Sequence, residues 1–174
     1  MAGHRKAVGC LKDQRGFLEV YMLVIFAVMA LSAFAVLSGI AFGAKKNADA
    51  VYQMLGEAVD FAGRAASIDV GGDLESAEPF ARQYFIVAFS RMTGTTFSGT
   101  SFVPSGSSPI KAPAVLQEFR YVRPGEAVPG GTARQPGFMA TVNVPVLWGD
   151  VPFIGPQFID VRMRYYQPAG RVQL

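Results

Sequence analysis

The chain has 174 residues, of which 51% are hydrophobic and 17% are charged, and its formal net charge is +3. The first 15 residues hold four Lys or Arg and one Asp, so they account for this charge, and the rest of the chain lacks the basic face typical of nucleic-acid-binding domains. The one His (His4) and the one Cys (Cys10) both precede residue 15, which excludes a Cys/His catalytic or metal site from the remaining residues.

Residues 1–16 form a short basic tail, which we expect to stay in the cytoplasm because Lys and Arg beside a membrane span resist translocation. Four Lys or Arg precede the apolar run that follows, whereas Lys45 and Lys46 come after it. The rest of the chain is therefore predicted to lie outside the cytoplasmic membrane. Cys10 lies near the membrane boundary, where palmitoylation is an alternative to an ordinary small residue in a tail.

Residues 17–44 are predicted to form a single transmembrane helix with membrane lipid as its partner. No charged residue occurs from Val20 to Ala44, and a helix needs about 20 apolar residues to cross a bilayer. The run is longer than the apolar core of a cleaved secretory signal. Signal-peptidase cleavage near Ala41-Phe42-Gly43, which would release a secreted protein, stays an alternative.

Small residues recur in this run at intervals of four, at Ala35, Gly39 and Gly43. In lipid, small residues allow two helices to approach closely. The spacing favours a span that packs against other spans, and an isolated anchor with ordinary alanine content is the alternative.

The basic tail closes on Arg15-Gly16-Phe17. This junction resembles the leader of type IV pilin-like proteins, in which a membrane aspartic peptidase cuts after the Gly. The resemblance implies that Gly16 is the last leader residue and Phe17 the first mature one. The family has a Glu at the fifth position after the Gly, where this chain has Tyr21; Glu19, at the third, is the candidate for that acidic residue. In a filament the carboxylate would pair with the free amine of a neighbouring subunit, and an interfacial Glu on an ordinary anchor is the alternative.

The wider layout is similar to the TadE-like minor pseudopilins of tight-adherence (Tad) pili, mainly over residues 12–70. It implies a structural subunit or assembly component of a type IV or Tad-like pilus, or of a related secretion system. The implied partners are other pilin-like or assembly subunits and a prepilin peptidase, with no nucleic acid. A single-pass, membrane-anchored extracytoplasmic binding domain without a filament role is the competing hypothesis.

Apolar residues continue at spacings of three and four through 45–68, and no proline separates them from the span. One helix from about Phe17 to Ile68 is the simplest prediction, and two helices with a bend near Gly43 are the alternative. The segment from Asp69 to Asp73, with Gly71-Gly72, is predicted to end the helix.

A second helix is predicted over 75–92, with Ser76 and Pro79 marking its start. One apolar face of this helix is expected to consist of Phe80, Tyr84, Val87, Ala88 and Met92. Residues 93–113 are rich in Ser, Thr, Gly and Pro and predict a loop.

Alternating polar and apolar residues then predict a small antiparallel sheet with one buried face. The expected strands are 117–123, 138–147 and 158–166. Pro145 limits the middle strand to an edge or a bulge, and 148–156 is expected to be a turning connector. The predicted fold is α+β: a long N-terminal helix whose first half spans the membrane, and a domain over 45–174 in which a second helix packs on the sheet.

The case for an enzyme is weak, and we expect no catalytic residue, cofactor or metal. Asp69, Asp73 and Glu75 lie near glycines and could bind Ca²⁺ loosely, but they lack the EF-hand spacing, and a solvated acidic turn is the simpler interpretation. Arg162 and Arg164 alternate along one expected strand, where solvated outward positions are favoured over a basic stripe.

Overall fold

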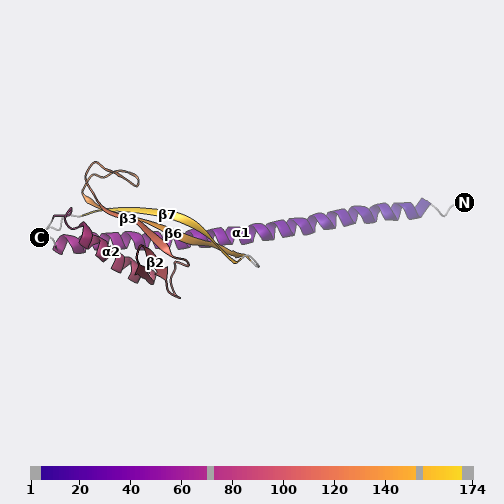
Figure 1. The fold of residues 1–174 in the computed structure, drawn as a ribbon. Coiled ribbons are helices and arrows are strands. Elements are labelled where there is room, and N and C mark those ends of the chain that lie inside the picture. Colours follow the sequence, from indigo (N-terminus) through magenta and orange to yellow (C-terminus); the bar gives the residue numbers. More distant parts are fainter. Residues whose placement is uncertain (1–4, 70–72, 152–154, 170–174) are drawn as a thin grey trace. The chain divides into compact units, whose positions relative to one another are not determined.

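The computed structural model describes the backbone of residues 5–69, 73–151 and 155–169, and the side chains of these residues except 5–15, 148, 150 and 151 (Figure 1). The chain divides into two compact units, Met1–Phe42 and Gly43–Leu174. The first unit contains the N-terminal part of helix α1 (Arg5–Asp69), and the second contains the rest of α1 and the remaining elements.

α1 is one uninterrupted helix of 65 residues. No proline occurs within it, and isolated glycines weaken a helix without ending it. The helix passes through Gly43 without a break, so the alternative of two separate helices is not adopted. The Gly71-Gly72 pair, predicted from the sequence to end the helix, lies outside the described residues.

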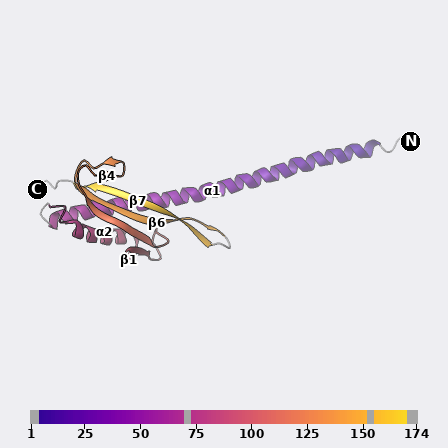
Figure 2. The same ribbon diagram turned by 45° about the horizontal axis from the view of Figure 1, so that its top comes forward.

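The second unit combines the end of α1 and a second helix, α2 (Glu78–Thr93), with antiparallel strands. The strands of the main sheet are β1 (Thr95–Ser98), β2 (Ser101–Pro104), β3 (Ala114–Val122), β6 (Gly137–Val151) and β7 (Gly155–Pro168). They lie in the order β1-β2-β3-β6-β7, and β4 (Ala127–Val128) pairs with β5 (Gly131–Thr132) in a separate ribbon. Both helices cover the same face of the main sheet (Figure 1, Figure 2). The predicted α+β class is confirmed.

β6 and β7 overlap two of the expected strands but are longer, with 15 and 14 residues. They pair from Gly137 to Val151, so much of the expected connector belongs to the strands, and only its central residues, 152–154, lie outside the described part. β3 accompanies β6 only as far as Asn143. At Pro145, β6 therefore pairs with β7 but not with β3. The proline, which has no N–H, thus lies where β6 is an edge strand on its β3 side.

The prediction of a loop over 93–113 is wrong for its first half, because β1 and β2 form a hairpin there. Gly99 has a φ of +64°, a backbone conformation that glycine adopts without strain, and it allows a tight turn between Ser98 and Ser101. The Ser and Gly content of the segment hides the short β-forming runs around Phe97 and Phe102, and burial of Phe102 stabilises the pairing.

The predicted inner face of α2 is wrong at Phe80, Val87 and Met92, whereas Ala88 is buried and Tyr84 is partly buried against the core. The helix buries Ala81, Phe85, Ala88 and Phe89, whereas Phe80, Val87 and Met92 are exposed. Because Tyr84 to Phe89 is apolar on nearly all sides, its periodicity does not define one face. The two alanines allow the helix backbone to approach the sheet closely, and Phe85 and Phe89 fill the space beside them.

The core lies between the helices and the sheet, and α1 contributes a stripe that repeats every three or four residues. This stripe consists of Val51, Leu55, Ala58, Val59, Ala62 and Ala66. Aromatic side chains join α2 to the sheet: the ring centroids of Phe85 and Phe119 are 5.1 Å apart, and those of Phe89 and Phe102 are 4.8 Å apart. A smaller cluster of Val122, Ala133 and Met139 lies outside this core.

Candidate functional site

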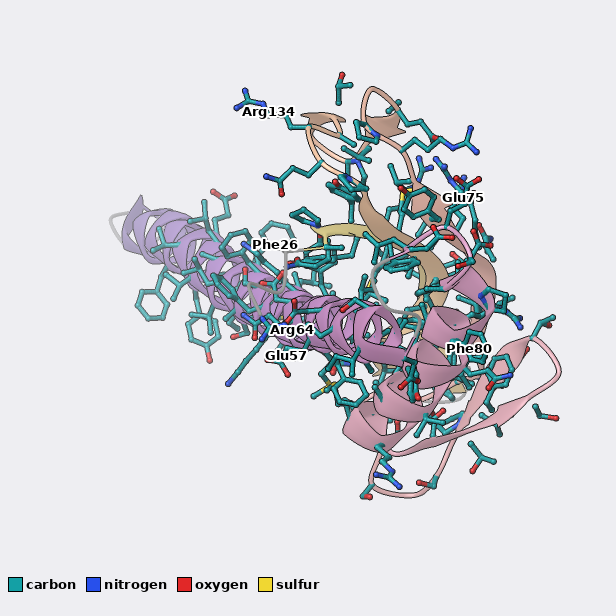
Figure 3. All side chains as sticks on the ribbon, turned by 90° about the vertical axis from the view of Figure 1, so that its left-hand side faces the viewer. Phe26, Glu57, Arg64, Glu75, Phe80 and Arg134 are labelled. Carbon is teal, nitrogen blue, oxygen red and sulfur yellow. The ribbon has the colours of Figure 1, made fainter. Side chains whose placement is uncertain are left out.

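The apolar surface of α1 in the first unit is the main candidate site. Its most apolar 18-residue window has a mean hydropathy of 2.6, and none of that window is buried within the chain. Large side chains such as Phe17, Phe34 and Phe26 (Figure 3) are exposed. Among the described residues, this is the one helix that is long and apolar enough to cross a membrane, which makes it a candidate single span near the N-terminus.

The residues of the predicted processing junction all lie within α1. Gly16 and Phe17 are consecutive helical residues, and the side chain of Glu19 is exposed, with no hydrogen bond or ion pair to another described side chain. Glu19 and Tyr21 are two residues apart, so they point to opposite sides of the helix, about 200° apart. A carboxylate at Glu19 therefore faces a different direction from one at the fifth position. The side chain of Cys10 is outside the described part.

Ala35 and Gly39 are four residues apart and lie on nearly the same side of α1. Gly43, the next small residue at this interval, begins the second unit. A Cβ atom placed at Gly39 or Gly43 meets no atom of the described chain within 4 Å. These positions are thus open surface, where a neighbouring helix would find no protruding side chain.

The acidic residues at the end of α1 and after it are engaged separately and do not form one site. Asp69 accepts a hydrogen bond from the Tyr84 hydroxyl, which raises the pKa of Tyr84. Asp73 accepts the backbone N–H of Glu75 at 3.3 Å, and Glu75 forms an ion pair with Arg123. Within the described ranges, no three His, Cys, Asp or Glu side chains are placed to hold a metal ion.

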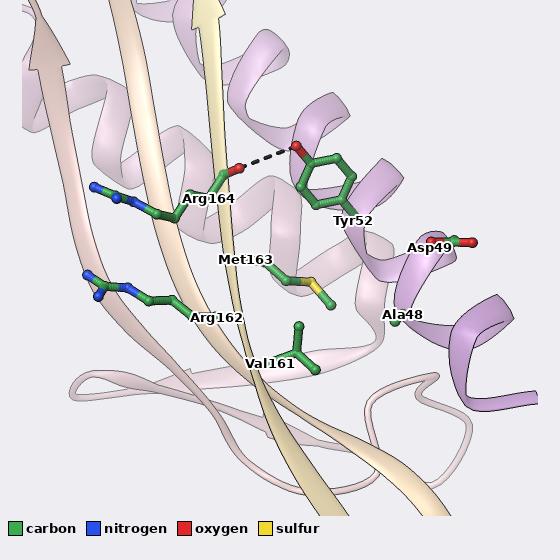
Figure 4. Close-up of a pocket in the computed structure, with 7 residues that line it drawn as sticks. All are labelled: Ala48, Asp49, Tyr52, Val161, Arg162, Met163 and Arg164. Carbon is green, nitrogen blue, oxygen red and sulfur yellow. Dashed lines mark hydrogen bonds between the residues drawn. The ribbon is translucent and has the colours of Figure 1, made fainter. Parts of the chain in front are cut away.

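A groove of about 350 Å³ lies between α1 and β7 in the second unit (Figure 4). Val161 and Met163 line it from the strand, and Ala48, Asp49 and Tyr52 line it from the helix. The Tyr52 hydroxyl donates a hydrogen bond to the Arg164 carbonyl at 3.3 Å and joins the two elements. The floor of the groove is apolar, and Asp49 is the carboxylate among its lining residues.

Arg162 and Arg164 also border this groove, but their side chains extend away from α1, on the opposite face of β7 from Val161 and Met163 (Figure 4). Both side chains are exposed. Neither forms an ion pair with another described side chain. The structure therefore confirms the prediction from the alternation that Arg162 and Arg164 take outward, solvent-exposed positions.

The far end of the β6–β7 hairpin carries exposed apolar residues that the sequence pattern did not single out. Phe158 and Ile159 are 38% and 48% exposed, and their strand partners are Leu147 and Val146. The alternation from 158 to 166 predicts the strand, but it cannot tell whether a position near its end is covered. The only signal in the sequence is that this segment is apolar on both faces.

Comparisons with protein-family models, curated proteins and solved structures give no match to this chain.

Proposed function

We propose that this protein is a membrane-anchored structural subunit of the pilin-like class, with the α1 segment of the first unit in the cytoplasmic membrane and the second unit outside it. The observation that carries the proposal is the continuity of α1. One helix contains both the exposed apolar run and the stripe that forms the core of the folded unit. A structural subunit of this class needs a span that leads directly into its folded domain, and the uninterrupted helix supports that role.

The junction Arg15-Gly16-Phe17 supports the pilin-like assignment through its resemblance to prepilin leaders. In this proposal a prepilin peptidase removes residues 1–16, and Phe17 becomes the mature N-terminus. The basic tail supports the orientation, because Lys and Arg are retained on the cytoplasmic side.

The mechanism of such a subunit is association. Ala35 and Gly39 present an open strip on which a second helix can pack closely in lipid. The neighbours would be other pilin-like or pilus-assembly subunits of a type IV or Tad-like system. No catalytic role is proposed for any residue.

The second candidate function is an anchored extracytoplasmic binding domain without a filament role. The direction of Glu19 favours it, because this carboxylate does not occupy the side of the helix where the pilin-like family has its Glu. The groove between α1 and β7 would then be the binding surface.

Mass spectrometry of the mature N-terminus separates the candidates. The full chain is expressed in cells that contain a type IV prepilin peptidase, and the membrane fraction is analysed. We expect a chain that begins at Phe17. An intact tail instead favours the anchored binding domain, and a start at or near Lys45 indicates a secreted form.

A matched pair of variants makes this test specific. Gly16→Val should leave the tail attached, because the resemblance places the cut after Gly16. Gly9→Val changes a glycine within the same tail and should not affect processing. If both variants are cut as the parent is, the processing enzyme does not recognise this junction, and the pilin-like proposal is wrong.

A further inference from the structure

β7 is the last strand of the main sheet, so one of its edges has no neighbouring strand among the described residues. Its pairing with β6 is regular from Phe158 to Pro168, without a bulge. Natural sheet edges are commonly protected from added strands by prolines, bulges or lysines. The stretch from Phe158 to Gln167 has none of these, and it is called the free edge below.

A hydrogen bond just after β7 shows which backbone groups point to the free edge. The Ala169 N–H donates to the Pro136 carbonyl at 2.9 Å, so these two residues form a hydrogen-bonded pair. In an antiparallel ladder such pairs alternate with pairs whose backbone groups point away from each other. Counted back from Ala169 in this regular register, Asp160, Arg162 and Arg164 direct their N–H and C=O groups away from β6.

Tyr52 of α1 limits the part of the free edge that is open. Its hydroxyl donates to the Arg164 carbonyl at 3.3 Å, which agrees with the outward direction of that carbonyl (Figure 4). No other hydrogen bond between described residues uses the outward backbone groups of Asp160 or Arg162. Within the described part of the chain, these groups are therefore open to a further strand.

On the side of the sheet that faces α1, the free edge borders the groove of about 350 Å³. A strand added beside β7 would direct every second side chain toward this groove, opposite Val161 and Met163. The groove floor is apolar, and Asp49 on the α1 wall disfavours a second carboxylate there. Apolar side chains therefore suit the positions that face the groove.

On the opposite side of β7, Arg162 and Arg164 are exposed and form no ion pair with another described side chain (Figure 4). They are two residues apart in a strand, a distance of about 7 Å. Alternate residues of an added strand have the same spacing, so two carboxylates at alternate positions would lie opposite the two guanidinium groups. Asp160 lies on this side as well, but two cations outweigh it.

We propose that the free edge of β7 binds an extended segment of another polypeptide, in which carboxylates alternate with apolar side chains. The segment adds to the sheet as a further strand. Its backbone pairs with Asp160 and Arg162, its apolar side chains enter the groove, and its carboxylates pair with Arg162 and Arg164. Main-chain hydrogen bonds supply affinity in this kind of recognition, and the alternate side chains supply specificity. The inference concerns the second unit alone and applies to either candidate function.

A second copy of β7 is the other occupant that the free edge could accept. An antiparallel pair centred on Val161 would place Asp160 of each copy opposite Arg162 of the other. The two-fold axis of such a pair turns the α1 segments after Gly43 in opposite directions. Two chains anchored in one membrane by the run before Gly43 do not suit that arrangement, so a separate segment is favoured.

Binding of labelled peptides to the full chain in detergent, followed by fluorescence anisotropy, tests the proposal. The probe is Thr-Val-Glu-Val-Glu-Val-Thr. One comparison peptide has Lys in place of Glu, and the other, Thr-Val-Val-Glu-Glu-Val-Thr, has the composition of the probe without its alternation. We expect each comparison peptide to bind at least about fivefold more weakly, because its charges or its apolar side chains no longer match the two sides of β7. Equal binding of all three peptides overturns the inference.

Two substitutions of Asp160 separate strand addition from simple charge attraction. Asp160→Pro removes an N–H that points away from β6, so it obstructs the free edge without removing a hydrogen bond between β6 and β7. It should weaken binding of the probe by at least about tenfold. Asp160→Asn removes the same charge but keeps the N–H, and it should bind the probe at least as tightly as the parent. Equal binding by the two variants contradicts strand addition.

Two arginine variants test the charge match. Arg162→Gln should weaken binding of the probe by about threefold, because it removes a cross-strand charge pair. Arg134→Gln is the control, since Arg134 is exposed on the segment before β6 (Figure 3). An equal effect of both variants would mean that the probe responds only to the total charge of the chain, and the inference would be wrong.

A modified probe covers the case in which Asp160→Pro does not fold, as judged by circular dichroism. In the proposed pairing the Glu amides of the probe face β7 and the Val amides face away. Methylation of the Glu amides should weaken binding to the parent by at least about tenfold, whereas methylation of the Val amides should not. Equal effects of the two modifications contradict strand addition.

Analytical ultracentrifugation of the full chain in detergent identifies the other occupant. A dimer of the parent that Asp160→Pro dissociates would show a second copy on the free edge, which overturns the assignment to a separate segment. The mature N-terminus does not depend on this edge, so the proposed processing and the proposed strand addition can each fail without the other.

Discussion

Arg120 links β3 to the segment between β3 and β6, which carries β4 and β5. Its guanidinium contacts Glu118 at 3.0 Å and also forms an ion pair with Glu126. Glu126 in turn accepts the backbone N–H of Arg123 at 3.3 Å. The hydrogen bond from Arg120, together with that N–H, lowers the pKa of Glu126. Charged hydrogen bonds thus help to hold this segment in place, and burial of Ala133 against Val122 of β3 and Met139 of β6 adds to them.

The lowered pKa of Glu126 makes a specific prediction for acid stability. The unfolded state binds a proton at Glu126 more readily than the folded state, so the stabilisation is fully present above the ordinary value of 4.5 and is lost as the pH falls through the folded pKa. Glu126→Gln should be less stable than the parent at neutral pH, and the difference should shrink as the solution is acidified. Urea unfolding of the full chain in detergent, followed by near-ultraviolet circular dichroism at several pH values, measures it.

Glu57→Gln is the control for this experiment, because Glu57 is an exposed carboxylate on α1 outside the ion pairs of the described residues (Figure 3). Its stability difference from the parent should not change with pH in the same way. A difference for Glu126→Gln that grows on acidification would contradict the assigned role of the Arg120 ion pair.

At the scale of the element, α2 is held by its aromatic residues. Phe85 is fully buried, and its ring lies 5.1 Å from Phe119, 5.6 Å from Phe89 and 6.3 Å from Phe102, measured between centroids. Its aromatic contacts therefore reach its own helix and two strands of the sheet. Phe80 of the same helix is half exposed (Figure 3). The two residues have the same chemistry in opposite environments.

Phe85→Ala should lower the free energy of unfolding by about 3–5 kcal/mol, because it removes a buried ring and leaves a cavity. Phe80→Ala should lower it by less than about 1 kcal/mol, since surface substitutions have small effects. Denaturant unfolding of the full chain in detergent measures both. Equal losses for the two variants would mean that α2 does not pack on the sheet through the face described.

At the scale of the whole molecule, association of spans is the property that a structural subunit needs. Gly39→Leu adds a side chain where a single copy has open space, so any effect arises between copies or from lipid. We expect it to weaken self-association in bilayers by roughly three- to thirtyfold, the range that a helix contact of about 0.6–2 kcal/mol implies. Energy transfer between labelled chains in vesicles at several dilutions gives the equilibrium.

Ala33→Leu is the matched control for that measurement. Ala33 is also small and exposed, but it lies about 120° around α1 from Gly39. Its substitution should leave association unchanged. An equal loss from both variants would show that the strip of small residues is not the packing face.

Several parts of this molecule could be predicted from the sequence because their signals are local. The uncharged run from Val20 to Ala44 and the spacing after it predict one long helix, and α1 is continuous there. The alternation around Val142 and Met163 predicts strands with one buried face, because neighbouring residues of a strand point to opposite sides. The junction at Gly16 is a pattern of adjacent residues, and it remains a prediction about processing.

The sequence by itself therefore determined the α+β class, the candidate span and the expected strands, since hydropathy and periodicity act over a few residues. Only the tertiary structure decided which side of α2 is buried, because Phe80 and Phe85 are equally apolar and differ only in what packs against them. It also decided how β7 is placed against the end of α1, because the hydrogen bonds of Tyr52 and Asp60 join residues more than 100 positions apart, and no local pattern encodes such a pairing.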